Sequence, residues 1–318
     1  MHAHPHSHFG DIAKQTNRRL AWSVGLTAIF VIVEFIAGAW GNSLALLTDA
    51  AHNFTDVIAL GLSWYALRLA LKPAHARKTF GYHRAGILVA LVNSTTLVII
   101  ALGIFYEAWH RFLAPPEVNT TVLIGVGGIA FVINLGTALL VKKGSEHDLN
   151  LRSAFLHLMG DVVSTLGAVL AGVIILITGW NWLDPFVSVL IGLLILWNAW
   201  SILRQSIDIL LESTPENIDV KAMVDDVLSI DGVQGVHDLH VWSISENTRM
   251  LTAHIRTGDI SVSAGSSLQN QINGILLHKY NIQHATLQLE CEGCTPSLLY
   301  CDIKEVKHTH NDASQVSF

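Results

Sequence analysis

Charged residues are scarce in this sequence. Asp, Glu, Lys and Arg make up 14% of its 318 residues, whereas a soluble domain usually carries about 25%. Hydrophobic residues make up 51%, and the mean hydropathy is +0.45. The formal net charge is -6, and no basic patch of the kind that binds nucleic acid is present. The composition therefore predicts a membrane protein without a nucleic-acid partner.

Cysteines and catalytic motifs are also few. Cys291, Cys294 and Cys301 are the only cysteines and lie close together, which disfavours a secreted disulfide framework. The sequence has no His-Glu dipeptide and hence no H-E-x-x-H metalloprotease helix. It has no Gly-Lys dipeptide either, which excludes a Walker A loop and P-loop ATP-driven pumping.

Long apolar runs are plentiful instead. A helix needs roughly 20 residues to cross a bilayer, and six runs approach or exceed this length. The first run is too long for the apolar core of a cleavable signal peptide, so we interpret it as a retained span. Between the runs lie polar segments with Gly and Pro. We expect spans near 20–40, 44–70, 86–113, 119–141, 152–178 and 183–204.

Lys and Arg lie almost entirely on one side of these predicted spans. Twelve of them precede the first span, follow the sixth, or fall between the second and third or the fourth and fifth. Arg111 stands alone on the opposite side. The positive-inside rule therefore predicts that both termini lie in the cytosol.

After about Leu211 the composition becomes that of a soluble domain. Apolar residues at helical spacing predict helices over 219–230 and 266–280. Alternation of apolar and polar residues predicts strands over 236–244, 250–256 and 285–290. This order of helix, strand, strand, helix, strand suits a small α+β layer with both helices on one face.

Two predicted spans carry the same His–Asp spacing. "LTDAAHNFTD" contains His52 and Asp56, and "FLHLMGD" contains His157 and Asp161. Residues four apart lie on the same face of a helix, so each pair can present two ligands to a facing helix. Two imidazoles and two carboxylates make a tetrahedral set that zinc accepts.

Either pair alone could instead hydrogen-bond to a neighbouring helix. Inserting an Asp at the centre of a span costs about 2.5 to 3.5 kcal/mol, and intramembrane ionisable groups are functional by default. The repetition of the pair favours metal binding. Asp49 shares roughly the face of His52 and is a lesser candidate metal ligand, with a packing role equally open. Glu34, Asn93 and Asn134 are weaker candidates.

Zinc binding at such a site would compete with protonation. A bound imidazole must be neutral and a bound carboxylate ionised, so zinc binding releases protons and protonation releases zinc. An unperturbed His titrates near pH 6.5, that is, about the cellular range. Proton-coupled antiport is therefore the natural hypothesis, and an affinity for zinc that did not weaken on acidification would count against it.

Several segments together resemble the cation diffusion facilitator family. In the apolar part they are "SLALLTDAAHNFTD", "FGYHR", "HLMGDVVSTLGAVLAG" and "DPFVSVLIGLLIL". In the soluble part they are "GVHDLHVWSI", "LTAHI" and "HATLQLE". The likeness covers roughly residues 8–295. It implies a homodimeric exporter of divalent metal that uses the proton gradient, with six spans and a cytosolic metallochaperone-like domain.

The resemblance also implies ligands in the membrane. The transport site of the zinc-preferring members has two His and two Asp, and manganese-type members carry Asp in place of the His on the second span. The residues that match the zinc-type site position for position are His52, Asp56, His157 and Asp161.

Other residues match metal-binding positions outside the membrane. His237, His254 and Glu290 fall where zinc-transporting members bind metal in the cytosolic domain. His240 is a lesser candidate, because in a regular strand it points to the face opposite His237.

Further candidates lie in the loops and tails. Cys291 and Cys294 resemble a cysteine pair that completes a second cytosolic site in some members, although free cytosolic thiols are common. His75 lies in the loop where some members bind an additional ion. A short His-rich tract can load metal or form a flexible solvated tail, and here it comprises His2, His4, His6 and His8.

The sequence thus predicts an α-helical membrane protein with six transmembrane helices plus a C-terminal cytosolic α+β (ferredoxin/metallochaperone-like) domain. Its expected parts are a His-rich cytosolic tail (1–18), the transmembrane domain (19–210), a metal-binding and dimerisation domain (211–292) and a disordered tail (293–318).

The predicted function is zinc efflux from the cytoplasm in exchange for protons, by a homodimer in a bacterial plasma membrane that also binds zinc in its cytosolic domain. Two alternatives are a membrane-anchored metal sensor and a membrane metallohydrolase. A sensor leaves the intramembrane pairs unexplained. A hydrolase normally keeps one metal position open for water, whereas four protein ligands close it. We therefore expect no enzyme activity.

Overall fold

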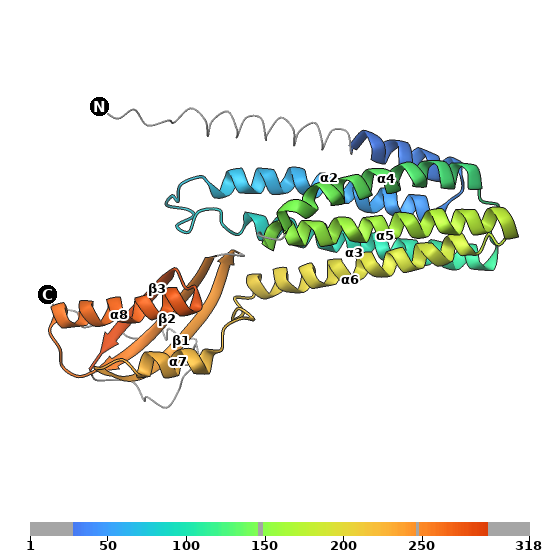
Figure 1. Cartoon of the computed structure of the whole chain (residues 1–318). Coiled ribbons are helices and arrows are strands. Elements are labelled where there is room, and N and C mark those ends of the chain that lie inside the picture. The colour runs from blue at the N-terminus through green and yellow to red at the C-terminus, as the bar shows by residue number, and fades with distance from the viewer. Residues whose placement is uncertain (1–27, 146–148, 246–247, 292–318) are drawn as a thin grey trace, which may run out of the picture. The chain divides into compact units, whose positions relative to one another are not determined.

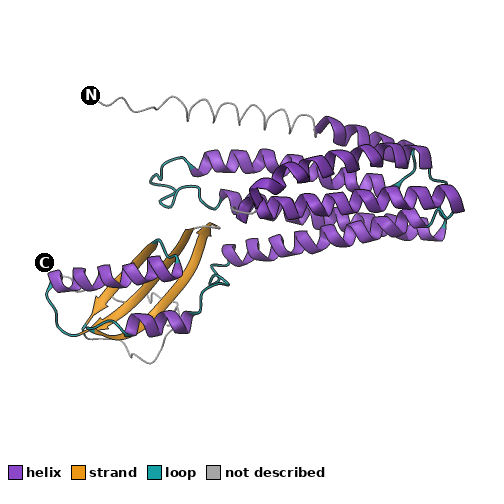
Figure 2. Cartoon of the chain, viewed as in Figure 1, coloured by secondary structure: helices purple, strands orange, loops and turns teal. Residues whose placement is uncertain are grey.

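The computed structural model describes residues 28–145, 149–245 and 248–291. By its internal contacts the chain divides into two compact units, one up to Ile207 and one from Asp208 onward. The first unit is helical (Figure 1), and the second combines helices with a sheet (Figure 2).

The N-terminal unit shows helices where apolar runs predicted them. Four contain stretches long and apolar enough to cross a membrane, among the residues that are described. Only Ala28–Trp40 of the first helix falls among the described residues, and α2 lies outside this group because polar groups interrupt its apolar sequence. Four apolar spans are therefore clear, and six crossings stay a prediction. The helices are Ala28–Trp40, α2 (Leu44–Ala70), α3 (Ala85–Leu113), α4 (Thr120–Ser145), α5 (Leu149–Thr178) and α6 (Leu183–Leu210).

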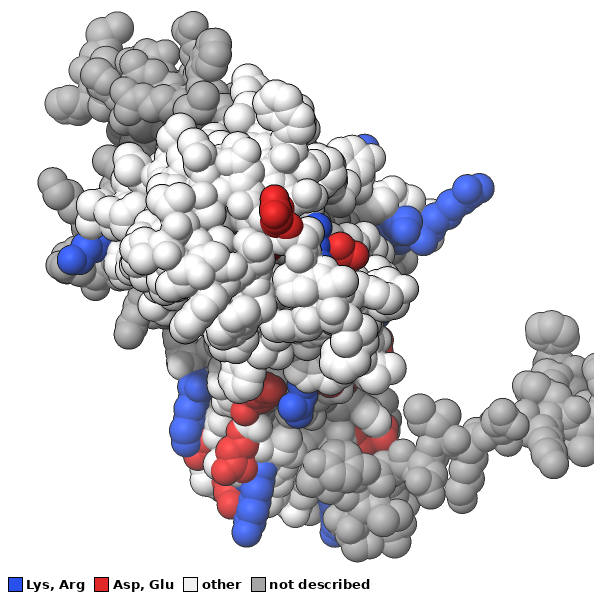
Figure 3. All heavy atoms as spheres, turned by 90° about the vertical axis from the view of Figure 1, so that its right-hand side faces the viewer, with Lys and Arg blue, Asp and Glu red and all other residues white. Residues whose placement is uncertain are grey.

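The outer faces of these helices are apolar. Large hydrophobic side chains lie exposed on them, including Ile177 at 79% and Trp197 at 80%. Figure 3 views the helical unit from the helix ends at the right of Figure 1, and this surface too is mostly uncharged, with few Lys, Arg, Asp and Glu. Soluble monomers rarely expose apolar patches of more than a few hundred Å². Exposed apolar faces of this extent are typical of helices that lie in a membrane.

Small residues bring α4 and α5 together. Ala168 of α5 and Leu123 of α4 are buried in one cluster with Leu46 of α2. A Cβ atom added to Gly172 of α5 would lie 3.0 Å from Cγ of Leu123, so a glycine is needed for this close approach. Helix α2 in turn contacts α3 and α5. The two His–Asp pairs therefore lie on neighbouring helices.

The N-terminus of α2 is held by a carboxylate from α6. Asp184 is fully buried and accepts hydrogen bonds from the Ser43 hydroxyl and the Leu44 N–H, both at 2.6 Å. It also accepts one from the Ala45 N–H at 3.3 Å. The first turn of a helix leaves such N–H groups without partners, and its positive dipole end favours a carboxylate. The contact fixes the start of the helix that carries the first His–Asp pair.

The C-terminal unit contains the predicted order of helix, strand, strand, helix, strand. Its elements are α7 (Val220–Leu228), β1 (Val233–Ser245), β2 (Thr248–Thr257), α8 (Val262–Tyr280) and β3 (His284–Glu290). The sheet order is β1-β2-β3. Strands β1 and β2 pair antiparallel, and β2 and β3 pair parallel. Sequence periodicity therefore located each element to within a few residues, while the ferredoxin-like class stays a prediction.

Both helices of this unit cover one face of the sheet, as predicted. Met223 of α7 and Ile272 of α8 are buried in the same cluster as Val241 and Leu251 of the strands. At the surface, the Lys279 ammonium and the Tyr280 hydroxyl of α8 both donate to the carboxylate of Asp226 on α7. These hydrogen bonds lower the pKa of the Asp226 carboxyl.

Strand β1 contains a bulge that corrects one expectation. His237 pairs with His254, and His240 pairs with Thr252, so three residues along β1 match two along β2. The extra residue follows from Asp238, which has a left-handed φ of 48°, a conformation that Asp tolerates better than most residues. Because alternate residues of β2 share a face, His240 lies on the same face as His237 and not on the opposite one.

Candidate metal centres

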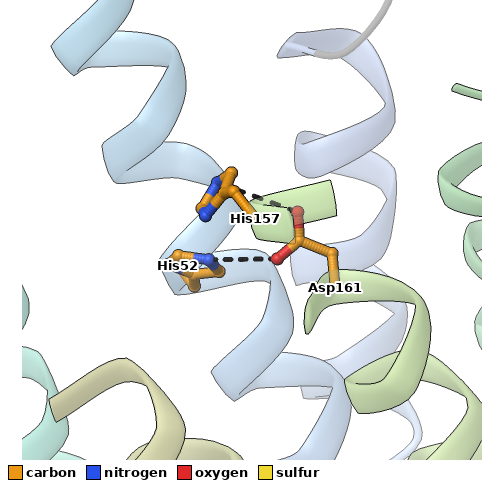
Figure 4. A group of neighbouring side chains, drawn as sticks. All are labelled: His52, His157 and Asp161. Carbon is orange, nitrogen blue, oxygen red and sulfur yellow. Dashed lines mark ion pairs between the residues drawn. The ribbon is translucent and has the colours of Figure 1, made fainter. Parts of the chain in front are cut away.

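The His–Asp pairs of α2 and α5 come together inside the N-terminal unit. His52, His157 and Asp161 each offer a ligand atom within 4.8 Å of the others (Figure 4). Asp56 joins them, because its Oδ2 lies 3.1 Å from Nε2 of His157. We call these four residues the membrane cluster.

The contacts within the membrane cluster form a closed ring. Between the helices, Nε2 of His52 lies 3.4 Å from Asp161 Oδ1, and the His157–Asp56 distance is 3.1 Å. Along each helix, the His–Asp distances are 3.6 Å on α2 and 3.8 Å on α5. The Nε2 atom of each imidazole therefore lies between two carboxylates, and each carboxylate lies between two imidazoles.

Burial differs around this ring. The side chains of His52 and Asp161 are 12% and 11% exposed, whereas those of Asp56 and His157 are 28% and 44% exposed. The cluster is therefore most exposed beside His157. His52 Nδ1 is buried without a hydrogen-bond partner, while its Nε2 faces the carboxylates. The donor set, two nitrogens and two carboxylate oxygens, is one that zinc accepts.

Asp49 lies outside this ring. Its Oδ2 accepts a hydrogen bond from the Asn53 amide at 3.2 Å, and the same amide lies 3.5 Å from Glu34 Oε2 on the first helix. From the sequence, Glu34 is only a weak candidate and Asn53 is not predicted. The four-residue spacing of Asp49 and Asn53 on one helix was the available signal.

A second group of ligands forms on the sheet of the C-terminal unit. Glu290 places Oε2 3.1 Å from His237 Nε2 and Oε1 3.0 Å from His254 Nδ1. The antiparallel β1–β2 register sets the two His side by side, and parallel pairing of β3 brings up Glu290. The His237 side chain is 2% exposed and Glu290 is 16% exposed. We call His237, His254 and Glu290 the C-terminal cluster.

The bulge adds a residue that the sequence analysis missed. Asp238 places Oδ2 3.5 Å from Nε2 of His254 and Oδ1 3.3 Å from Nε2 of His240. Because His254 turns its other nitrogen to Glu290, Asp238 can accept the Nε2 proton and fix the tautomer. Asp is depleted in strands, so an Asp within an alternating strand was the available sign of irregular backbone.

The remaining candidates are not gathered into either cluster. Nε2 of His75 lies 3.3 Å from the Tyr82 hydroxyl in the loop between α2 and α3. Cys291 is an exposed free thiol at the end of the described residues. Its predicted partner Cys294 and the N-terminal His tract lie outside the described residues.

The N-terminal unit has apolar spans and a ring of two His and two Asp, and the C-terminal α+β unit has a His–His–Glu group. Together these features define an integral membrane protein with residues suited to bind divalent metal. The comparisons identify it further. Residues 20–211 match the cation efflux transmembrane domain, and residues 215–292 match the cytoplasmic domain of cation efflux proteins. The chain belongs to this family, the cation diffusion facilitators, within its zinc-transporting type.

The similar proteins named in these comparisons are transporters and not enzymes. The cadmium, cobalt and zinc/H(+)-K(+) antiporter of Bacillus subtilis is 40% identical over 83% of this chain and 86% of its own length. The zinc transporter ZitB of Escherichia coli is 37% identical over 92% of this chain and 94% of its own. The solved metal-bound C-terminal domain of the CzcD transporter from Cuprividus metallidurans is 29% identical over 23% of this chain and 99% of its own, with a TM-score of 0.21.

Proposed function

We propose that this protein exports zinc from the bacterial cytoplasm across the plasma membrane in exchange for protons, and that the ion passes through the membrane cluster. Both termini then lie in the cytoplasm, as the Lys and Arg distribution predicts. The names of the relatives from Bacillus subtilis and Escherichia coli support zinc as the cargo.

The observation that carries this proposal is the alternating ring of two imidazoles and two carboxylates between α2 and α5. Ionisable side chains inside a membrane raise the free energy of insertion, and four of them placed together are typical of an ion pathway. The ring offers zinc its preferred nitrogen and oxygen ligands. It leaves no place for an activated water, which favours carriage over hydrolysis.

Proton exchange follows from the same ligands. Zinc binds neutral imidazole and ionised carboxylate, so protons and zinc compete for the same lone pairs. Protons that enter from the more acidic side release zinc there. At the less acidic side the protons leave, and the cluster accepts zinc again.

The C-terminal cluster has a separate part in the proposal. We propose that it binds a further zinc ion, and that this domain pairs with its twin in a homodimer. With about eighty residues, the domain has a small core, and pairing buries additional apolar surface. A particle size in detergent that corresponds to a monomer, both with and without zinc, would contradict the dimer.

Transport is tested in vesicles that contain the protein, a zinc dye and a pH dye. With the vesicle interior acidic, zinc should enter as protons leave. Asp56→Ala and Asp161→Ala should abolish both signals, because each breaks two contacts of the ring. Glu107→Gln is the matched control, since this exposed carboxylate of α3 pairs with Arg111 and lies outside the ring.

The outcomes separate the proposal from its rivals. Zinc binding without flux would favour the sensor. Flux that is indifferent to both Asp substitutions would place the ion pathway elsewhere. Zinc flux without proton movement would contradict the antiport.

The metal preference offers another test. His52→Asp replaces an imidazole nitrogen with a carboxylate oxygen and should shift transport towards harder ions such as manganese. A competition assay with zinc and manganese in the same vesicles measures this shift. Unchanged selectivity would mean that His52 does not contact the ion in transit.

A further inference from the structure

Two buried carboxyl groups near the membrane cluster, those of Glu34 and Asp49, have no part in the proposed transport step. Glu34 is fully buried and Asp49 is 2% exposed. The amide nitrogen of Asn53 lies 3.2 Å from Asp49 Oδ2 and 3.5 Å from Glu34 Oε2, so one donor faces both carboxyl groups. The other oxygens, Glu34 Oε1 and Asp49 Oδ1, are buried without hydrogen-bond partners. Two buried carboxyl groups with one unsatisfied oxygen each therefore lie close together.

The chemistry of this pair requires a proton. The Asn53 amide nitrogen lies within 3.5 Å of both carboxyl groups, so Glu34 and Asp49 are close neighbours. Ionised carboxylates only accept hydrogen bonds, and a proton on one carboxyl supplies the donor that the buried pair lacks. Two like charges in contact and out of water cannot both persist, so such pairs share one proton. A hard cation fits less well. Calcium, for example, takes about six to eight oxygen ligands, and this site has two unsatisfied ones.

We propose that Glu34 and Asp49 form a proton-binding site distinct from the metal ligands, which holds one proton while the membrane cluster is empty and releases it when zinc binds there. The Asn53 amide orients the two carboxyl groups. In the release step the O–H bond of the protonated carboxyl breaks, its electron pair stays on the oxygen, and the proton passes to water.

The link to zinc follows from the position of Asp49. It precedes His52 by three residues on α2 and so lies about one turn away on nearly the same face. Nε2 of His52 in turn lies 3.4 Å from Asp161 Oδ1, so Asp161 is near this stretch of α2. Zinc beside Asp161 offsets the negative charge that holds the proton on the pair. This link rests on the proposed function, whereas the shared proton does not.

Infrared difference spectroscopy of the full chain in lipid vesicles, with and without zinc, tests the proposal. A protonated carboxylic acid has a C=O stretching band apart from the carboxylate bands, and D₂O lowers its frequency. We expect this band in the zinc-free protein and its loss on zinc addition. Glu34→Gln and Asp49→Asn should each remove it, because the new amide donates to the remaining carboxylate in place of the proton.

Two control variants sharpen the assignment. Glu107→Gln removes an exposed carboxylate that pairs with Arg111, and it should leave the band and its zinc response unchanged. Asp56→Ala breaks the membrane cluster at its edge away from Asp49, and it should keep the band but lose the response to zinc. A native size-exclusion profile for every variant shows that a lost band does not reflect unfolding.

Several results would overturn the proposal. A native protein without the band, or a band that survives both Glu34→Gln and Asp49→Asn, would exclude the proton site. A band that both substitutions remove, but that zinc leaves in place, would exclude the exchange. A zinc titration of the same samples tests the proposed function separately. If the native chain and Asp56→Ala bind equal amounts of zinc, the membrane cluster is not a zinc site, whether or not the band is present.

Discussion

The two candidate metal clusters of this protein are built differently. The membrane cluster takes two residues from each of two helices and alternates imidazole with carboxylate around a ring. The C-terminal cluster takes one residue from each of three strands and has a single carboxylate between two imidazoles. The first has four side chains and the second has three, so a zinc ion in the second keeps a position for another ligand.

Charge balance explains this difference. With neutral imidazoles, two carboxylates cancel the double positive charge of zinc. This balance matters inside a membrane, where a net charge has a high free energy. The C-terminal cluster has one carboxylate, and its His254 is 25% exposed, so water can screen the remaining charge. We therefore expect the membrane cluster to carry the ion and the C-terminal cluster to hold it.

The largest expected effect comes from Asp161→Asn. This substitution keeps the shape of the side chain but leaves a loaded membrane cluster with an unbalanced positive charge. Zinc flux should fall to that of protein-free vesicles, while a zinc titration still finds the C-terminal cluster occupied. Asp259→Asn, an exposed acid of the C-terminal unit, serves as the control. If Asp161→Asn kept the native zinc flux, the membrane cluster would not be the cluster that carries the ion.

A smaller effect on transport is expected from Glu290→Gln. The Glu290 carboxylate contacts both imidazoles of the C-terminal cluster, so its replacement should remove the zinc bound there. Flux should fall in part and not vanish, because the membrane cluster is intact. Equilibrium zinc binding and vesicle flux measure the two effects on the same preparation. Complete loss of flux would instead make the C-terminal cluster part of the pathway.

Asp238, the residue at the bulge, should affect the zinc affinity of the C-terminal cluster without being one of its ligands. Asp238→Asn keeps a residue that tolerates the left-handed conformation but weakens the contact with Nε2 of His254. Replacing a residue that orients a metal-binding His typically lowers the metal affinity by about 10 to 100-fold. Zinc titration of the full chain should show a loss of this order. An unchanged affinity would mean that Glu290 and His237 alone orient His254.

The smallest effect is expected at the surface of the C-terminal unit. The hydrogen bonds from Lys279 and Tyr280 lower the pKa of Asp226, so the ionised form favours the folded state. This contribution is present above the pKa of an unfolded Asp, about 3.9, and is lost as the pH falls through the lower folded value. Asp226→Asn should speed hydrogen exchange of the α7 amides at neutral pH, and the difference from the native chain should shrink in acid. Asp225→Asn, at an exposed neighbouring position, is the control.

Local patterns predicted most of the architecture. Apolar runs located the helices of the N-terminal unit, and the span expected at 44–70 is the observed α2 (Leu44–Ala70). Periodicity also predicted the order of the C-terminal elements and the face that both helices cover. These features depend on residues a few positions apart, so the sequence carries them directly.

Contacts between distant residues were harder to predict. The bulge at Asp238 reversed the expected direction of His240, because a left-handed residue adds one position to β1. The capping of α2 by Asp184 joins residues about 140 positions apart. Neither contact leaves a periodic trace in the sequence.

The sequence by itself determined the helical membrane unit, the α+β unit and the two His–Asp pairs, because residues four apart share a helix face wherever the helix lies. The tertiary structure decided which imidazole faces which carboxylate, and it gathered the three-strand cluster through antiparallel and parallel pairing. It also buried Glu34 of the first helix against Asp49 and Asn53 of α2. The physical reason is that packing sets which faces of separate elements meet, and a local pattern does not contain that information.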